Sequence, residues 1–320
     1  MYEIPDILKI ENIEEKIKQI TEFVKEQVFE DYQKKGIVIG LSGGIDSAVT
    51  AALCVKAIGP ENVLGLILPE KESDENSQKL AELLAQTLKI KTVNKDISNI
   101  LDLFGVYENK EKIVKKIFVN FNHKCKYRIA VPSKTEENSG IPFLEIEDDK
   151  NVIHKLKISL DDFLNLTAST SIKHRTRMIM LYYYAEKNDF LVTGTTNKTE
   201  FLQGYFVKYG DGGSDIEPLN HLYKSQIYQI ADFLKLPEVI RNQQASPDVW
   251  SFSTSDEEFF YAAPYNIVDL ILLARENNVS IEEIKKYSDI SIEKIERLIK
   301  FQNQKELKSK QKREFPHSIK

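Results

Sequence analysis

The chain contains the stretch Gly36-Ile37-Val38-Ile39-Gly40-Leu41-Ser42-Gly43-Gly44-Ile45-Asp46-Ser47-Ala48-Val49-Thr50. Its apolar, β-branched beginning is typical of a buried parallel strand. Gly43 and Gly44 follow, and both can adopt positive φ and let the backbone approach a ligand closely. Small residues then start a helix that we expect to reach about Ile58. Because free N–H groups and the positive end of the dipole lie at a helix start, we expect this turn to bind phosphate.

Three oxygen-bearing side chains stand at the mouth of this helix, namely Ser42, Asp46 and Ser47. An ordinary strand–helix turn is the alternative, but it does not account for two glycines coinciding with three such residues. No Gly-Lys-Ser/Thr follows at Walker spacing. The turn resembles the Ser-Gly-Gly-x-Asp-Ser pyrophosphate loop of the ATP-pyrophosphatase superfamily. That resemblance implies cleavage of ATP between its α and β phosphates, and it leaves NAD, GMP and asparagine synthetases and the tRNA-thiolating enzymes open.

The composition is that of an ordinary globular protein, with 320 residues, 42% hydrophobic and 29% charged. A net charge of −5 argues against a general binder of nucleic acid or of anionic membranes. No apolar run is long enough to cross a bilayer, and the N-terminus lacks the order of a secretion signal. Cys54 and Cys125 give no disulfide framework, so we expect a cytoplasmic location.

Strand and helix patterns alternate along the chain. Residues 7–34 have the pattern of an amphipathic helix or helix pair, and Ser73 is expected to cap a helix that reaches Leu88. A long helical stretch covers residues 161–186. The predicted strands are residues 36–41, 62–68, 90–93 and 190–194. This order predicts an α/β fold with a parallel, doubly wound sheet, whose ligands bind at the carboxyl ends of the strands.

The pattern changes over residues 104–158, which we interpret as a small β-rich insert on the α/β core. Apolar and polar residues alternate on both sides of an acidic turn at residues 148–151, as in an antiparallel hairpin. His123 and Cys125 offer two metal ligands, but two do not make a zinc site, so we expect packing or exposure instead. The C-terminal part, residues 264–320, is predicted to be helical.

A second glycine-rich turn follows the last predicted strand. It reads Gly204-Tyr205-Phe206-Val207-Lys208-Tyr209-Gly210-Asp211-Gly212-Gly213-Ser214-Asp215. Lys208 supplies positive charge for phosphate or carboxylate oxygens, while Asp211 and Asp215 can accept hydrogen bonds from a ribose or attract an ammonium ion. An ordinary surface loop would explain the presence of these charged residues, but not their placement between glycines beside a predicted phosphate loop.

Two charged residues flank this turn. Glu200 precedes it, and Lys224 follows it at the beginning of a helix. Glu200 and Asp46 are suited to hold Mg²⁺, a hard cation that prefers carboxylate and phosphate oxygens. Lys224 is a second source of positive charge for phosphoryl oxygens.

The second turn is similar to the Gly-Tyr/Phe-Phe-x-Lys-Tyr-Gly-Asp-Gly-Gly-x-Asp motif of the NAD synthetase family. The other Ser-Gly-Gly-x-Asp-Ser families lack this motif. Together with Arg175-Thr-Arg177-Met and Thr193-Gly-Thr…Glu200, the resemblance covers about residues 1–103 and 159–320. It implies an adenine nucleotide α-hydrolase-like, Rossmann-like fold, and we expect one NAD-synthetase-like domain over residues 1–320.

The resemblance also implies roles for individual residues. ATP would be bound by Ser42, Gly43, Gly44, Asp46, Ser47, Arg175, Thr195, Lys224 and Ser246. Mg²⁺ would be held by Asp46 and Glu200. The acyl substrate would be contacted by Arg177, Tyr182, Tyr205, Lys208, Asp211, Asp215 and Lys312. The catalytic residues would be Lys224, Asp46, Asp211 and Asp215, and the last two would share an ammonia pocket with Tyr182.

The implied reaction is ATP-dependent amidation of deamido-NAD to NAD through an acyl-adenylate, with release of AMP and pyrophosphate. Ammonia would be the nitrogen donor, supplied free or by a separate glutaminase, because too few residues precede Gly36 for a glutaminase domain. The family is homodimeric, so the resemblance implies a homodimer. We expect no nucleic acid and no membrane among the partners.

Three features depart from the family pattern, and one of them is the insert at residues 104–158, which the short bacterial enzymes of the family lack. The family's Thr/Ser-Asp-Glu-x-Glu-Leu-Gly element appears as Ser-Asp-Glu-Glu-Phe-Phe-Tyr at residues 255–261, and its His-Lys-Arg element appears as Gln311-Lys312-Arg313. Aromatic residues thus replace the small end of a substrate-covering loop. An amide ligase of the same type that acts on a different carboxylate is therefore the alternative. A non-catalytic nucleotide-sensing module is a second one, against which the presence of Asp46, Glu200 and Lys224 argues.

Overall fold

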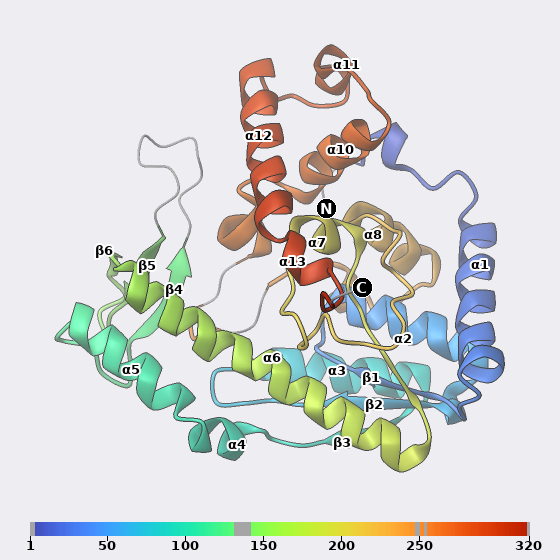
Figure 1. The fold of residues 1–320 in the computed structure, drawn as a ribbon, viewed down its shortest axis with the longest axis horizontal. Coiled ribbons are helices and arrows are strands. Elements are labelled where there is room, and N and C mark those ends of the chain that lie inside the picture. Colours follow the sequence, from blue (N-terminus) through green and yellow to red (C-terminus); the bar gives the residue numbers. More distant parts are fainter. Residues whose placement is uncertain (1–3, 131–141, 247–249, 253–254, 319–320) are drawn as a thin grey trace.

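A parallel sheet forms the centre of the computed structural model, which describes residues 4–130, 142–246, 250–252 and 255–318 (Figure 1). Among these residues its strands are β1 (Ile37–Gly40), β2 (Val63–Ile67), β3 (Lys91–Asn94) and β7 (Leu191–Thr193). They lie in the order β3-β2-β1-β7 with every pair parallel, so the predicted strands and fold class are confirmed. The chain runs outward from β1 to β3 and returns on the other side of β1. The strand order therefore reverses between β1 and β7, where such sheets bind ligands.

Strand β1 contributes to a different hydrophobic core on each face of the sheet. Ile37 and Ile39 pack with α1 (Ile13–Glu26), α2 (Ile45–Ile58), α3 (Glu75–Leu88) and α8 (Lys224–Phe233). Val38 packs on the other face with α4 (Ser98–Leu103) and with α6 (Leu160–Asn188), which crosses in front of the sheet in Figure 1. Because successive side chains of a strand alternate, one short apolar run supplies both layers.

The helix starts show one wrong prediction. The predicted stretch 7–34 comprises η1 (Asp6–Leu8), α1 and a π-helical turn, η2 (Gln27–Asp31). The cap of α3 is Asp74, whose side chain accepts a hydrogen bond from the Asn76 amide at 2.9 Å, and not Ser73. The Ser73 hydroxyl instead accepts hydrogen bonds from the Glu70 amide and the Arg177 guanidinium.

The C-terminal region is helical, as predicted. It comprises α10 (Tyr265–Glu276), α11 (Ile281–Lys286), α12 (Ile292–Lys308) and α13 (Lys310–Arg313), which Figure 1 shows together. Helix α10 is buried along most of its length, so its apolar residues form core. The remaining short elements are η3 (Pro60–Asn62), α7 (Lys198–Gln203), α9 (Glu238–Arg241) and η4 (Glu257–Tyr261).

Residues 104–158 contain a helix and a small antiparallel sheet. These are α5 (Val106–Ile117), β4 (Lys126–Ala130), β5 (Phe143–Glu147) and β6 (Ile153–Lys157), with the strands in the order β4-β5-β6. The predicted hairpin is β5–β6, and β4 adds a third strand; the polar tract at residues 133–140 lies outside the described residues.

Cys125 is buried in a core with Val114 and Trp250, which confirms that it packs. Within the described ranges, no group of three or more potential metal ligands occurs. No helix among the same residues is long and apolar enough to pass through a membrane.

Candidate active site

The glycine-rich turn between β1 and α2 is held by its own serines. The Ser42 hydroxyl accepts from the Gly44 amide at 3.2 Å and lies 3.1 Å from the Ser47 hydroxyl, which donates to the Gly44 carbonyl at 3.0 Å. Gly43 has φ of +82°, and a Cβ there would lie 2.3 Å from the Ser77 carbonyl oxygen. Only glycine fits this position, so the start of α3 packs directly against the predicted phosphate loop.

Three charged side chains from different helices meet beside this turn: Asp46 of α2, Glu200 of α7 and Lys224 of α8. We call them the site cluster. The Lys224 ammonium forms an ion pair with Asp46 and lies 3.6 Å from Glu200 Oε1. Asn197 Nδ2 donates to Asp46 Oδ1 at 2.9 Å, which ties the end of β7 to the first turn. The structure thus brings these predicted residues together at the switch point of the sheet.

Glu200 and Lys224 are oriented by the starts of their helices. Asn197 and Glu200 form a reciprocal capping box on α7, which fixes Oε2 of Glu200 and leaves Oε1 toward Lys224. The Lys224 amide donates to Thr199 Oγ1 at 3.1 Å, and that hydroxyl donates to Asp269 at 2.5 Å. These bonds join α7, α8 and α10 behind the site.

Asp269 is a residue that the sequence analysis missed. Its carboxylate is fully buried and accepts hydrogen bonds from the Ser225 amide at 2.7 Å and the Ser225 hydroxyl at 2.6 Å. A lone acidic residue within the apolar run of α10 was the available signal, because a buried carboxylate needs partners. Its negative charge at the start of α8 also offsets the unfavourable position of Lys224 at a helix N-terminus.

The electrostatics of the site cluster favour an additional cation. Burial and the neighbouring Asp46 carboxylate raise the pKa of Glu200 well above its usual value. Burial alone would lower the pKa of Lys224, but the Asp46 and Glu200 carboxylates outweigh it and raise that pKa. Two carboxylates thus share one ammonium group. This donor set fits Mg²⁺, which proteins hold through one or two carboxylates together with substrate phosphates.

The second glycine-rich turn is fastened to the C-terminal segment. The Lys208 ammonium donates to the Gln311 and Glu314 carbonyls, both at 2.8 Å. The Lys312 ammonium donates in return to the Gly204 and Phe206 carbonyls at 2.9 and 3.0 Å. Both predicted substrate lysines therefore bind backbone carbonyls in this structure.

The two aspartates of this turn have separate partners. Asp211 accepts from the Val207 amide at 2.9 Å and lies 3.4 Å from His174 Nδ1. Asp215 accepts from the Tyr182 hydroxyl at 3.0 Å and from the Val192 amide at 2.8 Å, on the edge of β7. The predicted grouping of Tyr182 with Asp215 is present. No described contact joins Asp215 or Lys208 to Ser42 or Asp46, so their joint role stays a prediction.

The predicted arginines lie two residues apart on α6, so they point to different sides of the helix. Arg177 donates to the Leu68 carbonyl at 3.2 Å and to the Ser73 hydroxyl at 3.3 Å, beyond the end of β2. Arg175 is exposed and donates to the Lys208 carbonyl at 3.3 Å. Thr195 is half-buried and lies between the end of β7 and the start of α7.

The aromatic departure at residues 255–261 has a structural explanation. Asp256 is buried and accepts from the Tyr205 hydroxyl at 2.7 Å and the Tyr265 hydroxyl at 3.0 Å. Phe260 stacks on Tyr205 with 4.3 Å between ring centroids. Burial raises the pKa of Asp256, and its charge in turn helps to raise that of Glu200. Ser246 is exposed and follows Ala245, whose carbonyl accepts from the Asp256 amide at 3.0 Å.

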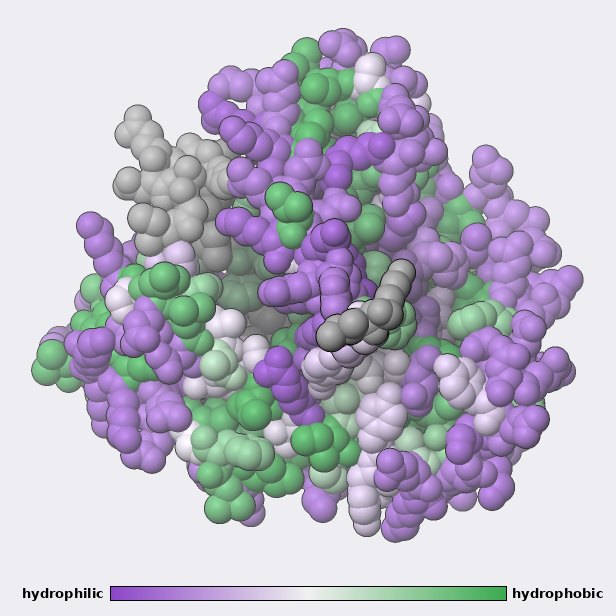
Figure 2. All heavy atoms as spheres, viewed as in Figure 1, coloured by the Kyte–Doolittle hydropathy of each residue, from purple (hydrophilic) through white to green (hydrophobic). Residues whose placement is uncertain are grey.

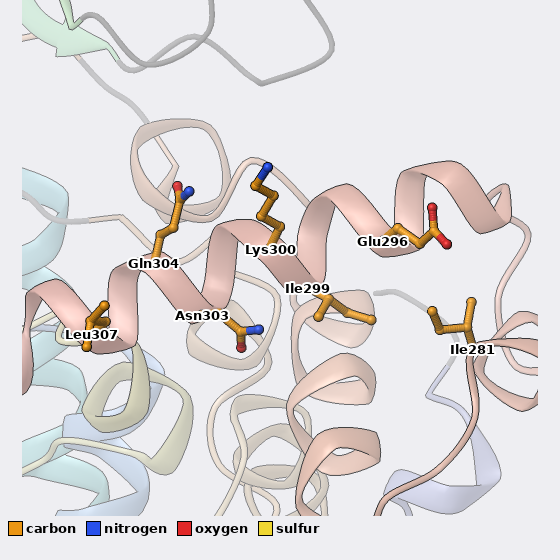
Figure 3. Close-up of a pocket in the computed structure, with 7 residues that line it drawn as sticks. All are labelled: Ile281, Glu296, Ile299, Lys300, Asn303, Gln304 and Leu307. Atoms are coloured by element: carbon orange, nitrogen blue, oxygen red, sulfur yellow. The ribbon is translucent and has the colours of Figure 1, made fainter.

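A pocket of about 360 Å³ lies elsewhere, on α11 and α12 (Figure 3). It is lined by Ile281, Glu296, Ile299, Lys300, Asn303, Gln304 and Leu307. None of these residues belongs to the site cluster or to the predicted substrate contacts. The pocket therefore plays no part in assigning the site.

Comparison with known proteins shows where the chain belongs. The family model named NAD synthase matches residues 16–141 and 134–313. The chain is a member of the NAD synthase family. It is 36% identical to the NH(3)-dependent NAD(+) synthetase of Rhizobium rhizogenes over 92% of this chain and 88% of that protein. The protein of the same name from Thermotoga maritima is 37% identical over 92% of this chain and 95% of its own length.

Solved structures of other proteins show the same architecture. The NH3-dependent NAD synthetase from Campylobacter jejuni subsp. jejuni, in complex with the nitrate ion, superposes with a TM-score of 0.64 at 26% identity, covering 97% of this chain and 100% of that one. NMN synthetase from Francisella tularensis has a TM-score of 0.67 at 24% identity, covering 96% of this chain and 98% of that one. At this identity the likeness is evidence of a shared fold only. The family match also runs through residues 104–158, which we had expected to lie outside the resemblance.

Proposed function

We propose that this protein is an NAD synthase that amidates deamido-NAD with ATP and ammonia. The observation that carries the proposal is the site cluster beside the Ser-Gly-Gly turn, in which Asp46 and Glu200 share the Lys224 ammonium. Relatives named NH(3)-dependent NAD(+) synthetase, at 36% and 37% identity over most of the chain, support the same reaction. Residues 1–320 act as one domain in this proposal, with 104–158 as an insert.

The first half-reaction activates a carboxylate. A nicotinate carboxylate oxygen attacks the α-phosphorus of ATP, and the bond to the β-phosphate breaks. Ser42, Ser47 and the turn amides bind the departing pyrophosphate. Lys224 stabilises the negative charge that develops on the phosphoryl oxygens. Asp46 and Glu200 would hold Mg²⁺, which would neutralise phosphate charge when bound.

The second half-reaction forms the amide. Ammonia attacks the activated carbonyl carbon, loses a proton, and the carbon–oxygen bond to AMP breaks. Asp215, next to the Tyr182 hydroxyl, orients the incoming ammonium ion and accepts its proton together with Asp211. Arg177 and Tyr205 contact the dinucleotide, and no protein nucleophile is needed. An external glutaminase is a possible source of the ammonia.

We further propose a cytoplasmic homodimer. Both cysteines are free and buried, which fits a reducing compartment. Exposed apolar side chains lie at the end of α4 and along α6, and Figure 2 shows apolar areas over this part of one face. They are Leu103, Phe104, Leu160, Leu164, Ile179 and Tyr183. A patch of this kind marks interaction surfaces more often than plain surface. Light scattering tests the dimer, and a monomer at micromolar concentration would contradict it.

The decisive assay mixes protein, ATP, Mg²⁺, NH₄⁺ and deamido-NAD and follows NAD and AMP. We expect the two products in equal amounts. Parallel reactions replace deamido-NAD with nicotinate mononucleotide or with unrelated carboxylates. AMP formation with another acid but not with deamido-NAD would favour the alternative amide ligase. Absence of AMP with every acid would favour a nucleotide-sensing module.

A further inference from the structure

A second group of buried charges lies outside the site cluster. It pairs Glu70 and Glu72, which follow β2, with Lys110 of α5 and Lys173 of α6, and we call it the balanced cluster. The Lys173 ammonium donates to Glu70 at 2.8 Å and also to Glu72, and the Lys110 ammonium donates to Glu72. Both lysine side chains are fully buried. Two negative and two positive groups therefore compensate one another away from water.

Most partners of the two glutamates come from residues 104–158. The Tyr107 hydroxyl donates to Glu70 at 2.6 Å, and the Tyr127 hydroxyl donates to Glu72 at 2.9 Å. Lys110 belongs to the same region and lies 4.7 Å from the Trp250 ring. The structure thus uses this region to cover and neutralise the carboxylates that follow β2.

The segment that carries these carboxylates also touches the candidate active site. Its two ends, Leu68 and Ser73, both accept hydrogen bonds from Arg177. Arg177 lies one helical turn beyond Lys173 on α6, so one face of this helix binds both the ends of the segment, through Arg177, and the carboxylates between them, through Lys173. The following helix α3 packs with its Ser77 carbonyl against Gly43 of the phosphate loop.

We propose that α5 and β4 position the substrate site through the balanced cluster, and that Lys110 of α5 is the positioning residue. This rests on the proposed function where it assigns Arg177 to deamido-NAD. Removing the Lys110 charge leaves a buried carboxylate uncompensated. The segment at residues 68–73 relieves that cost by moving toward water. Leu68 and Ser73 then no longer hold Arg177 in place.

The test is a double-mutant cycle with Lys110→Met and Glu72→Gln. Each single variant unbalances the cluster, whereas the double variant leaves one carboxylate, Glu70, with one ammonium, Lys173. We expect each single variant to raise KM for deamido-NAD about tenfold with kcat changed less than about threefold. The double variant is expected to return KM to within about threefold of the wild-type value. Lys112→Met is the control, because Lys112 pairs with Glu108 on the exposed face of α5.

Amide hydrogen exchange over residues 68–77 gives a readout that does not depend on the reaction. We expect faster exchange in both single variants and recovery in the double variant. Tyr127→Phe removes one hydroxyl and no charge, and it replaces a single charge variant that fails to fold. We expect it to raise KM and the exchange rate as the charge variants do, but by a smaller factor. Wild-type turnover of deamido-NAD reports separately on the proposed function.

Two results would overturn the positioning role. The first result is that the single variants unfold at a lower midpoint while KM and amide exchange over residues 68–77 stay unchanged. The cluster would then only stabilise the fold. The other is a double variant whose KM is no closer to wild type than those of the single variants, because charge balance would then not matter.

Discussion

The site cluster and the balanced cluster contain the same kinds of side chain in different proportions. In the balanced cluster two lysines meet two glutamates, and the Glu70 and Glu72 side chains keep 0% and 13% of their surface exposed. In the site cluster one lysine meets two carboxylates, and the Asp46 and Glu200 side chains keep 17% and 15% of their surface exposed. A surplus of negative charge that still reaches solvent can accept a cation from outside. A group in which the positive and negative charges are equal in number has no such surplus, so the charge balance separates a binding site from a structural contact.

The largest effect is expected when the balanced cluster loses a charge. Lys173→Met leaves two buried carboxylates with one ammonium, and it should lower the free energy of unfolding by about 3–5 kcal/mol. Urea denaturation measures this directly. Lys71→Met is the matched control, since Lys71 pairs with Asp102 at the half-exposed surface. A loss below about 1 kcal/mol for Lys173→Met would show that the cluster is not compensated in the way its contacts indicate.

Removing the lysine of the site cluster should affect chemistry more than stability. Lys224→Met deletes the donor that stabilises charge on the phosphoryl oxygens, so we expect kcat to fall about a hundredfold, or ~3 kcal/mol. The fold should remain intact by circular dichroism. Lys198→Met is a control on the neighbouring helix, because Lys198 pairs with Glu276 instead. Near-normal turnover in Lys224→Met would remove Lys224 from the mechanism.

Replacing Asp269, which accepts hydrogen bonds at the start of α8, should have a smaller effect than replacing Lys224. Asp269→Ala leaves the Thr199 hydroxyl and the Ser225 amide and hydroxyl without their acceptor, and buried unsatisfied donors cost about 1–3 kcal/mol. We expect unfolding free energy to drop by about 2 kcal/mol and kcat to fall with it, because Lys224 loses its fixed start of helix α8. Unchanged stability would mean that these donors find other acceptors.

The smallest expected effect is a shift in the pH at which kcat/KM declines. Burial and the Asp46 and Asp256 charges raise the pKa of Glu200, so Glu200 gains a proton at a higher pH than an ordinary glutamate. As pH falls through that raised value, the cation-binding carboxylate is lost and kcat/KM should decline. Asp256→Asn removes one of the charges, so it should move this decline to lower pH by less than about one unit.

Asp232→Asn is the control for the pH profile, since Asp232 pairs with Arg241 away from the site. A shift to higher pH in Asp256→Asn, or the same shift in Asp232→Asn, would contradict the assignment of the decline to Glu200.

The strands, the helices and their order could be predicted from the sequence because local residue patterns determine them. Short runs with β-branched residues mark the strands, three of them followed by glycine or proline, and their order predicts which ends share an edge. Asp46, Glu200 and Lys224 could therefore be expected to meet, although they come from three helices. The cap of α3 was placed one residue early, because serine and aspartate cap equally well and only the chain path decides between them.

The partners that lie behind the site could not be predicted in the same way. Asp269 acts on residues 44 and 70 positions earlier in the chain, and Lys173 on residues 101 and 103 positions earlier. No local pattern records such a pairing. A single buried charge in an apolar stretch shows that a partner must exist, but packing alone decides which one it is.

The central claim, that the site cluster supports adenylation of a carboxylate, is tested most directly by an oxygen tracer. Deamido-NAD with ¹⁸O in its nicotinate carboxylate is incubated with the wild-type protein, ATP, Mg²⁺ and NH₄⁺, and the products are analysed by mass spectrometry. The proposed mechanism predicts one ¹⁸O atom in AMP and none in pyrophosphate. Label in inorganic phosphate with ADP as the second product, or NAD formed without label in AMP, would contradict it.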